Sequence, residues 1–166
     1  MQRQTIAVAM SELKEQFATW MNLTQTSRVL DARLEERIRE AADLSLAEYE
    51  TLFRLKLASG HPPQMGEIAN LLINSPSGMT RIADRLEKDG LIARETPKDN
   101  RRVVLLCLTE KGQHVLAKAD RAFQSALRES FADHLSATDL AELRRLMRKL
   151  LKSNGAWHEA RCAPPL

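Results

Sequence analysis

Residues 75–112, SPSGMTRIADRLEKDGLIARETPKDNRRVVLLCLTEKG, constrain the fold of this chain more than any other stretch. Ser75 and Pro76 are an N-cap and a first-turn proline, and Gly90 is placed to end the helix that they begin. Residues 91–96 and 103–108 have the aliphatic and β-branched composition of two strands, and the PKDNRR segment between them is rich in turn formers. The pattern predicts a short helix followed by a β-hairpin.

Another helix is expected immediately before this segment. Residues 68–72 carry apolar side chains at helical spacing, and Asn74 leaves room only for a tight turn. Two helices joined in this way are typical of a helix-turn-helix. A capping box of Ser45 and Glu48 opens an earlier helix, which the Gly and Pro residues of segment 59–63 bring to an end.

Long amphipathic helices are expected at both ends of the chain. Residues 11–41 predict one helix about 46 Å long, at about 1.5 Å per residue. Because this exceeds the width of a small domain, part of its apolar stripe needs an outside partner, which indicates a dimer. After the hairpin, Thr109 caps a helix running toward Phe131, and Ser136 with Asp139 opens a final one. The stripe consists of Leu13, Phe17, Trp20, Thr24, Ser27, Leu30, Leu34, Ile38 and Ala41.

The helix that begins at Pro76 is amphipathic, with an outer face suited to nucleic acid. Its apolar face consists of Met79, Ile82, Ala83 and Leu86. Its opposite face and edges carry Ser77, Gly78, Thr80, Arg81, Asp84, Arg85 and Lys88. A DNA major groove about 12 Å wide accepts such a helix, and cations at a hairpin tip suit a neighbouring minor groove. The alternative is a solvated face, on which Arg81 and Arg85 form ion pairs with Asp84 and Asp89.

The two motifs resemble those of the MarR family of bacterial transcription regulators. EIANLLINSPSGMTRIADRLEKDGLIARE is similar to that family's helix-turn-helix, and DNRRVVLLCLTEKG resembles its wing. The resemblance implies a mainly α-helical fold with a small β-hairpin wing, in which a winged helix-turn-helix is embedded in a helical dimerisation domain. We therefore expect a dimerisation helix over residues 1–44, a DNA-binding lobe over 45–112, C-terminal dimerisation helices over 113–153 and a tail over 154–166.

The resemblance also implies a function and a set of contacts. We expect a cytoplasmic homodimer that binds a pseudo-palindromic double-stranded DNA operator and acts as a repressor released by a small-molecule effector. The recognition-helix contacts are expected from Ser75, Pro76, Ser77, Gly78, Thr80, Arg81 and Arg85, and the wing contacts from Lys98, Asn100, Arg101 and Arg102. The family's wing aspartate and arginine fall either on Asn100 and Arg102 or on Asp99 and Arg101, and Asp99 is the expected wing-bracing residue in either register.

Other residues allow narrower expectations. Trp20, Tyr49 and His61 are candidates for an effector pocket, although a role in the core or at a dimer interface suits Trp20 and Tyr49 better. Cys107 lies in an apolar strand and Cys162 in the tail, which leaves a thiol-based redox-sensing regulator as one alternative. A winged-helix protein–protein adaptor that does not bind DNA is the other. No metal spacing, phosphate loop, nucleophile–base arrangement or membrane-length apolar run is apparent, so we expect no metal, cofactor, enzymatic activity or membrane partner.

Overall fold

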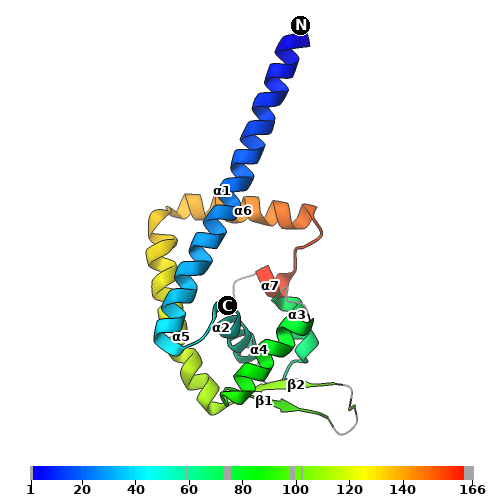
Figure 1. Cartoon of the computed structure of the whole chain (residues 1–166), viewed down its shortest axis with the longest axis vertical. Helices are drawn as coiled ribbons and strands as arrows, with labels where there is room; N and C mark the ends of the chain where they lie inside the picture. Colours follow the sequence, from blue (N-terminus) through cyan, green and yellow to red (C-terminus); the bar gives the residue numbers. More distant parts are fainter. Residues whose placement is uncertain (1, 59, 73–75, 98–99, 102, 163–166) are drawn as a thin grey trace.

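The computed structural model describes residues 2–58, 60–72, 76–97, 100–101 and 103–162. The chain is mainly helical with one antiparallel two-stranded hairpin, which confirms the predicted fold class (Figure 1). In chain order the elements are α1 (Gln2–Ala42), α2 (Leu46–Leu57), α3 (Met65–Leu71), α4 (Pro76–Lys88), β1 (Ile92–Glu95), β2 (Leu105–Leu108), α5 (Glu110–Ser130), the 3-10 turn η1 (Ala132–His134), α6 (Ala137–Ser153) and α7 (Glu159–Cys162).

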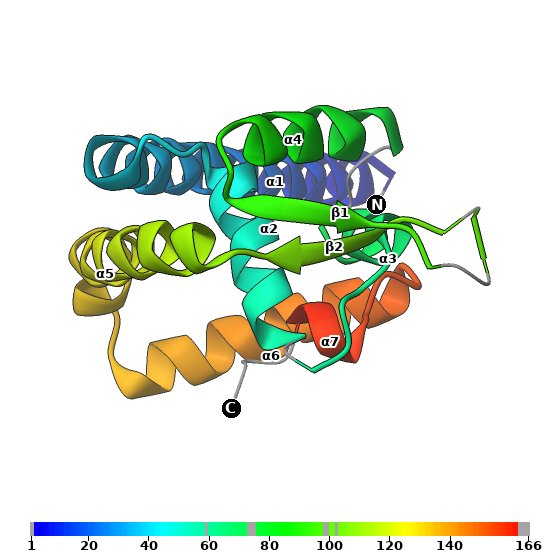
Figure 2. The same ribbon diagram turned by 90° about the horizontal axis from the view of Figure 1, so that it is seen from below.

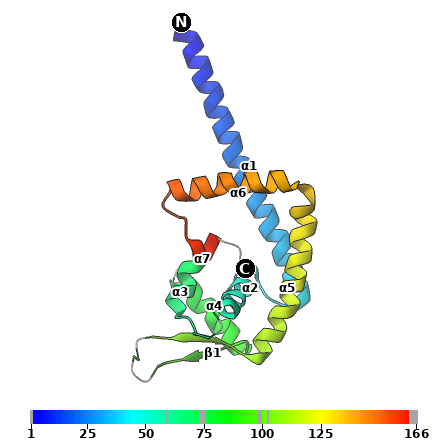
Figure 3. The ribbon, with the colours of Figure 1, turned by 180° about the vertical axis from the view of Figure 1, so that it is seen from behind.

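Helix α1 is longer than the apolar stripe predicts. It begins at Gln2 rather than at Ser11, because no glycine or proline interrupts the residues before the stripe. Its C-terminal half packs along α5, and its N-terminal half stands away from the rest of the chain (Figures 1 and 3). A helix held along only part of its length leaves the remainder of its apolar stripe uncovered.

The capping signals locate the starts of three helices correctly. The Ser45 hydroxyl accepts from the backbone N–H of Glu48, and the Glu48 carboxylate accepts from the backbone of Ser45, which completes the box at α2. Ser136 and Asp139 form the same arrangement at α6. Thr109 caps α5 by accepting from a backbone N–H one turn later.

The predicted ends of the two strands were wrong. The strands are shorter than residues 91–96 and 103–108, since only the pairs from Ile92 with Leu108 to Glu95 with Leu105 lie in register. Val104 instead accepts a backbone hydrogen bond from Met65, so its carbonyl faces away from β1. The segment expected as a tail, residues 154–166, includes the short helix α7.

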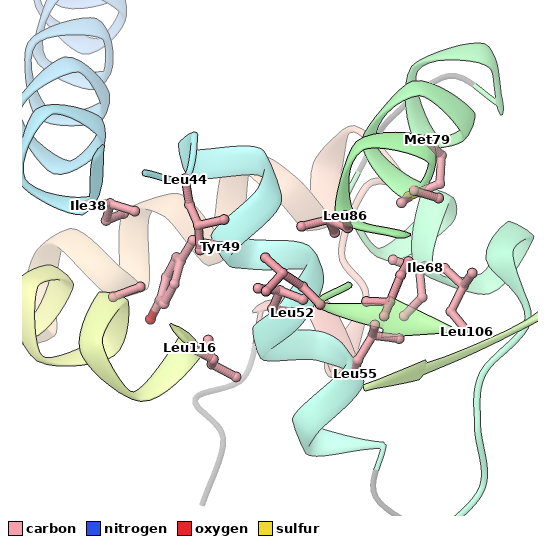
Figure 4. Packing of buried hydrophobic residues seen from close by; sticks show 14 of the residues in the cluster. Ile38, Leu44, Tyr49, Leu52, Leu55, Ile68, Met79, Leu86, Leu106 and Leu116 are labelled. Atoms are coloured by element: carbon pink, nitrogen blue, oxygen red, sulfur yellow. The ribbon is translucent and has the colours of Figure 1, made fainter. Parts of the chain in front are cut away.

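One apolar core joins the helix-turn-helix, the hairpin and the long helices. Met79, Leu86 and Ile68 pack over Leu52 and Leu106, so α2, α3, α4 and β2 share buried side chains (Figure 4). A second part of the same core joins α1 and α5 to α2; it contains Ile38, Leu44, Tyr49, Leu116 and Ala119. The orientation of α4 therefore depends on α2, which lies in the middle of this core.

Candidate nucleic-acid interface

Helix α4 has the two faces that its sequence predicts. Met79, Ala83 and Leu86 are fully buried, and Ile82 is half-buried. Figure 2 shows α4 and the hairpin together at one surface of the molecule, with the tip of the hairpin extending beyond the helix. The opposite face of α4 is therefore open to a partner.

The predicted recognition residues are distributed along this open face. Ser77, Thr80 and Arg81 are exposed, Gly78 is half-buried, and Pro76 is the first residue of the helix. Ser75 lies outside the described residues. The first turns of α4 thus present small polar groups, with one cation at Arg81, and backbone N–H groups at a helix N-terminus favour a phosphate.

Arg85 is held by the protein itself. Its Nε lies 3.1 Å from Oε1 of Glu48 and 3.7 Å from Oδ2 of Asp89, and Nη2 donates to the backbone carbonyl of Asp43 at 3.3 Å. Glu48 is buried and also caps α2, so its carboxylate links the start of α2 to the last turns of α4. Arg85 therefore orients α4, and the DNA contact expected from it stays a prediction.

A further bracing arginine, Arg94, lies on strand β1. Its guanidinium binds Asp84 at 2.7 Å and Glu87 at 2.9 Å, and Nη2 donates to the carbonyl of Thr80 at 3.5 Å. These contacts fix the hairpin against the outer edge of α4. Sequence reasoning missed this residue, although two acidic residues three positions apart on α4 were a signal that a neighbouring cation faces them.

The loop of the hairpin contains the predicted wing residues. Asn100 and Arg101 are exposed, whereas Lys98, Asp99 and Arg102 lie outside the described residues. The backbone N–H of Asn100 donates to Pro97, and that of Val103 donates to Asn100, so the chain turns here. The strand register does not decide which arginine enters a groove, and both alternatives stay predictions.

The last four residues of the wing segment, TEKG at 109–112, connect the hairpin to α5. The Thr109 hydroxyl donates toward the carbonyls of Gly90 at 2.8 Å and Leu91 at 3.0 Å, and Lys111 donates to the carbonyl of Asp89 at 2.6 Å. Gly90 has a φ of +70°, which glycine adopts without strain and which allows α4 to end there. Gly112 lies so close to the Leu91 carbonyl that a Cβ atom would collide with it.

The three candidates for an effector pocket do not come together within one chain. Trp20 and His61 are exposed on α1 and on the loop after α2, whereas Tyr49 is buried. The Tyr49 hydroxyl donates to Asp120 at 2.9 Å; burial and this neighbouring carboxylate raise the pKa of Tyr49 well above its ordinary value. Tyr49 lines a hollow of about 270 Å³, together with Glu50, Phe53, Arg54, Leu72 and Phe123.

The described residues give little support for metal binding, membrane crossing or a reactive thiol. No group of three His, Cys, Asp or Glu side chains is arranged to hold a metal ion in the described part of the chain. None of the helices, as far as they are described, is both long and apolar enough to cross a membrane. Burial and the neighbouring Glu95 carboxylate raise the pKa of the Cys107 thiol, which disfavours the reactive thiolate.

Comparison with known proteins places this geometry among transcription regulators. Residues 44–104 match the MarR family. The chain is 30% identical over 138 residues to the transcriptional repressor MprA of Escherichia coli, covering 83% of this chain and 77% of that protein. It is 29% identical over 147 residues to the uncharacterized HTH-type transcriptional regulator YhbI of Bacillus subtilis, covering 86% of this chain and 93% of that protein.

A solved structure shows the same fold. The MarR family transcriptional regulator Sco3205 from Streptomyces coelicolor, in complex with DNA, aligns with a TM-score of 0.80 at 23% identity, covering 84% of this chain and 88% of that one. Transcription regulators are not enzymes, and the predicted lack of enzymatic activity agrees with these relatives. The chain belongs to the MarR family of winged helix-turn-helix transcription regulators.

Proposed function

We propose that this regulator is a homodimer that binds a pseudo-palindromic DNA operator and represses transcription until a small molecule releases it. The observation that carries the DNA-binding part is the exposed N-terminal half of α4, with Arg81 beside a hairpin whose tip carries Arg101. A helix enters a major groove with its first turns, and a basic hairpin reaches the next groove. A relative of the same fold is solved in complex with DNA, and a sequence relative is named a repressor.

Dimerisation is supported by uncovered apolar side chains. Leu13, Phe17 and Trp20 are 65%, 64% and 59% exposed on the half of α1 that stands away from the chain. On α6, Leu146 and Leu150 are 40% and 49% exposed. Contiguous apolar surface of this kind is rare on monomers, and a second copy of the chain would cover it. A dimer also supplies two recognition helices, which must lie about 34 Å apart to read successive major grooves.

Release by an effector is supported by the hollow at Tyr49. It lies between α2 and α5, and α2 connects the long helices to the helix-turn-helix through the shared core. A ligand that prefers one arrangement of these elements shifts the population toward it by its differential affinity. Because Tyr49 and Phe123 stack at 4.8 Å between ring centroids, the hollow suits an aromatic molecule. A protein that binds such a DNA operator must be located in the cytoplasm.

Binding to duplex fragments from the chromosomal region of the gene tests the DNA-binding proposal. We expect Arg81→Ala to weaken operator binding by about 1–3 kcal/mol and to relax base preference, as a base-reading arginine does. An equal loss of affinity for operator and random duplexes would show that Arg81 contacts a phosphate rather than a base. Weak binding that does not depend on salt concentration would favour the protein–protein adaptor, because neutralising phosphates releases counterions.

Oxidation tests the redox alternative separately. We expect peroxide not to change the DNA affinity of the unaltered chain. A Cys107→Ser, Cys162→Ser double variant should likewise keep its DNA affinity in peroxide. Loss of binding in the unaltered chain alone would establish thiol sensing and replace effector release as the mechanism.

A further inference from the structure

A cleft lies on the side of the hairpin that faces the C-terminal end of α2. Its volume is about 590 Å³, within the range of small-molecule sites. It is separate from the hollow at Tyr49, with which it shares no lining residue. Its wall consists of Leu55, Lys56, Ala58, Gly60, Pro62, Pro63, Leu106, Cys107, Leu108 and Gln113.

Part of the cleft is formed by an edge of strand β2. On the side away from β1, Leu106 donates its backbone N–H to the carbonyl of Pro63 at 3.0 Å, and Met65 donates to Val104 at 3.0 Å. Gln64 forms an isolated antiparallel bridge with Leu105. Residues 63–65 therefore continue the sheet beside the first half of β2.

This pairing stops where the cleft begins. Pro63 has no N–H to return to the Leu106 carbonyl, and the N–H of His61 donates to Ala58 at 3.2 Å instead of pairing with β2. Backbone groups two residues apart along a strand point to the same edge, so the N–H of Leu108 faces this side as the N–H of Leu106 does. Among the described residues, neither the Leu106 carbonyl nor the Leu108 N–H has a hydrogen-bond partner on this edge.

Lys56 is the one charged residue among the described residues that line the cleft; the Glu95 carboxylate neighbours Cys107 but is not a lining residue. Lys56 is exposed and forms no ion pair with any described residue, and Gln113 is neutral. Cys107 adds no negative charge, because its raised pKa keeps the thiol protonated. One backbone donor and one ammonium group thus border a wall of Leu, Pro and Ala side chains.

We propose that this cleft binds a small aliphatic carboxylate, whose oxygens meet the Leu108 N–H and the Lys56 ammonium while its chain lies on Leu55 and the two prolines. A carboxylate satisfies a backbone donor and a cation at once. None of the lining residues is aromatic, in contrast to the hollow at Tyr49, so a flexible alkyl chain suits the cleft better than a stacked ring. The site does not depend on whether the protein binds DNA.

Titration of the full chain with sodium octanoate in the absence of DNA tests the site. We expect saturable binding that shifts the backbone amide resonance of Leu108 in ¹H–¹⁵N spectra. Lys56→Met should weaken binding by about tenfold, equivalent to a loss of about 1.4 kcal/mol. Lys118→Met is the matched control, since Lys118 is exposed on α5 and does not line the cleft, and it should leave the affinity unchanged.

Two further measurements separate this proposal from unspecific apolar binding. Octylammonium, with the same chain and the opposite charge, should bind at least tenfold more weakly than octanoate, and Gln113→Glu should weaken octanoate binding by repulsion. Equal binding of the two amphiphiles, loss of binding in Lys118→Met, or a titration that leaves the Leu108 amide unmoved would overturn the proposal.

Discussion

Replacing Gly112 by alanine should destabilise the protein strongly, and Gly66 offers a matched control. A Cβ atom at Gly112 would collide with the Leu91 carbonyl oxygen and lie 2.8 Å from Cδ1 of Leu108 and 3.0 Å from the carbonyl carbon of Leu91. The oxygen cannot withdraw without cost, because it accepts hydrogen bonds from the N–H of Thr109 at 3.1 Å and from its hydroxyl at 3.0 Å. Gly66 lies in α3, where a Cβ would meet nothing within 4 Å.

The magnitude follows from these contacts. Overpacking costs about 1–3 kcal/mol, and weakening the two hydrogen bonds adds about 0.5–1.5 kcal/mol each. We therefore expect Gly112→Ala to lower the free energy of unfolding by about 2–6 kcal/mol. Gly66→Ala should raise it by about 0.5–1 kcal/mol, because alanine favours an exposed helical position.

Urea denaturation followed by circular dichroism, at one fixed protein concentration, measures both variants. A fixed concentration is needed because the stability of a dimer depends on it. A Gly112→Ala variant as stable as the unaltered chain would contradict this expectation. In that case α5 could shift away from Leu91 at no cost, and the close approach would not explain the glycine of the wing motif.

Three other substitutions test contacts between elements of the fold. Arg94→Met should lower the free energy of unfolding by about 1 kcal/mol, since its two ion pairs are partly exposed. It should also weaken operator binding without changing the salt dependence of the affinity. If the slope of log affinity against log salt concentration fell by about one, Arg94 would instead contact a phosphate. Glu48→Gln should destabilise by about 1–3 kcal/mol in urea denaturation, because the buried carboxylate both caps α2 and pairs with Arg85; no loss would show that the neutral amide serves equally. Tyr49→Phe should cost about 1 kcal/mol through the lost hydrogen bond to Asp120, with unchanged thermal unfolding as the contrary result.

The sequence predicts those parts of the fold that depend on local chemistry. The capping boxes at Ser45 and Ser136, the proline at the start of α4 and Gly90 at its end all act within a few residues, so their consequences can be inferred without tertiary structure. The amphipathic pattern of α4 likewise identifies its buried face. The full extent of α1 was missed because the prediction followed the apolar stripe, whereas α1 begins at Gln2, before the stripe starts.

Features that depend on two distant segments could not be predicted in the same way. The bracing role of Arg94 requires knowing which face of the hairpin meets α4, and the cleft beside β2 exists only because residues 63–65 pair with that strand. Arg85 illustrates the same limit within the candidate site. Its spacing marks it as exposed and cationic, but its main partner is Glu48, which lies on another helix.

The acidic residues of α4 explain how a modest net charge is compatible with binding to DNA. The chain carries a net charge of only +3, and the sequence leaves open that Arg81 is neutralised by Asp84 one turn away. In the structure Asp84 and Glu87 pair with Arg94, and Asp89 lies near Arg85. The solvated-pair alternative therefore applies to Arg85, whereas Arg81 forms no ion pair with any described residue. Since Asp84 and Glu87 pair with Arg94 of the hairpin, Arg81, the cation nearest the start of the helix, stays available to a phosphate or a base.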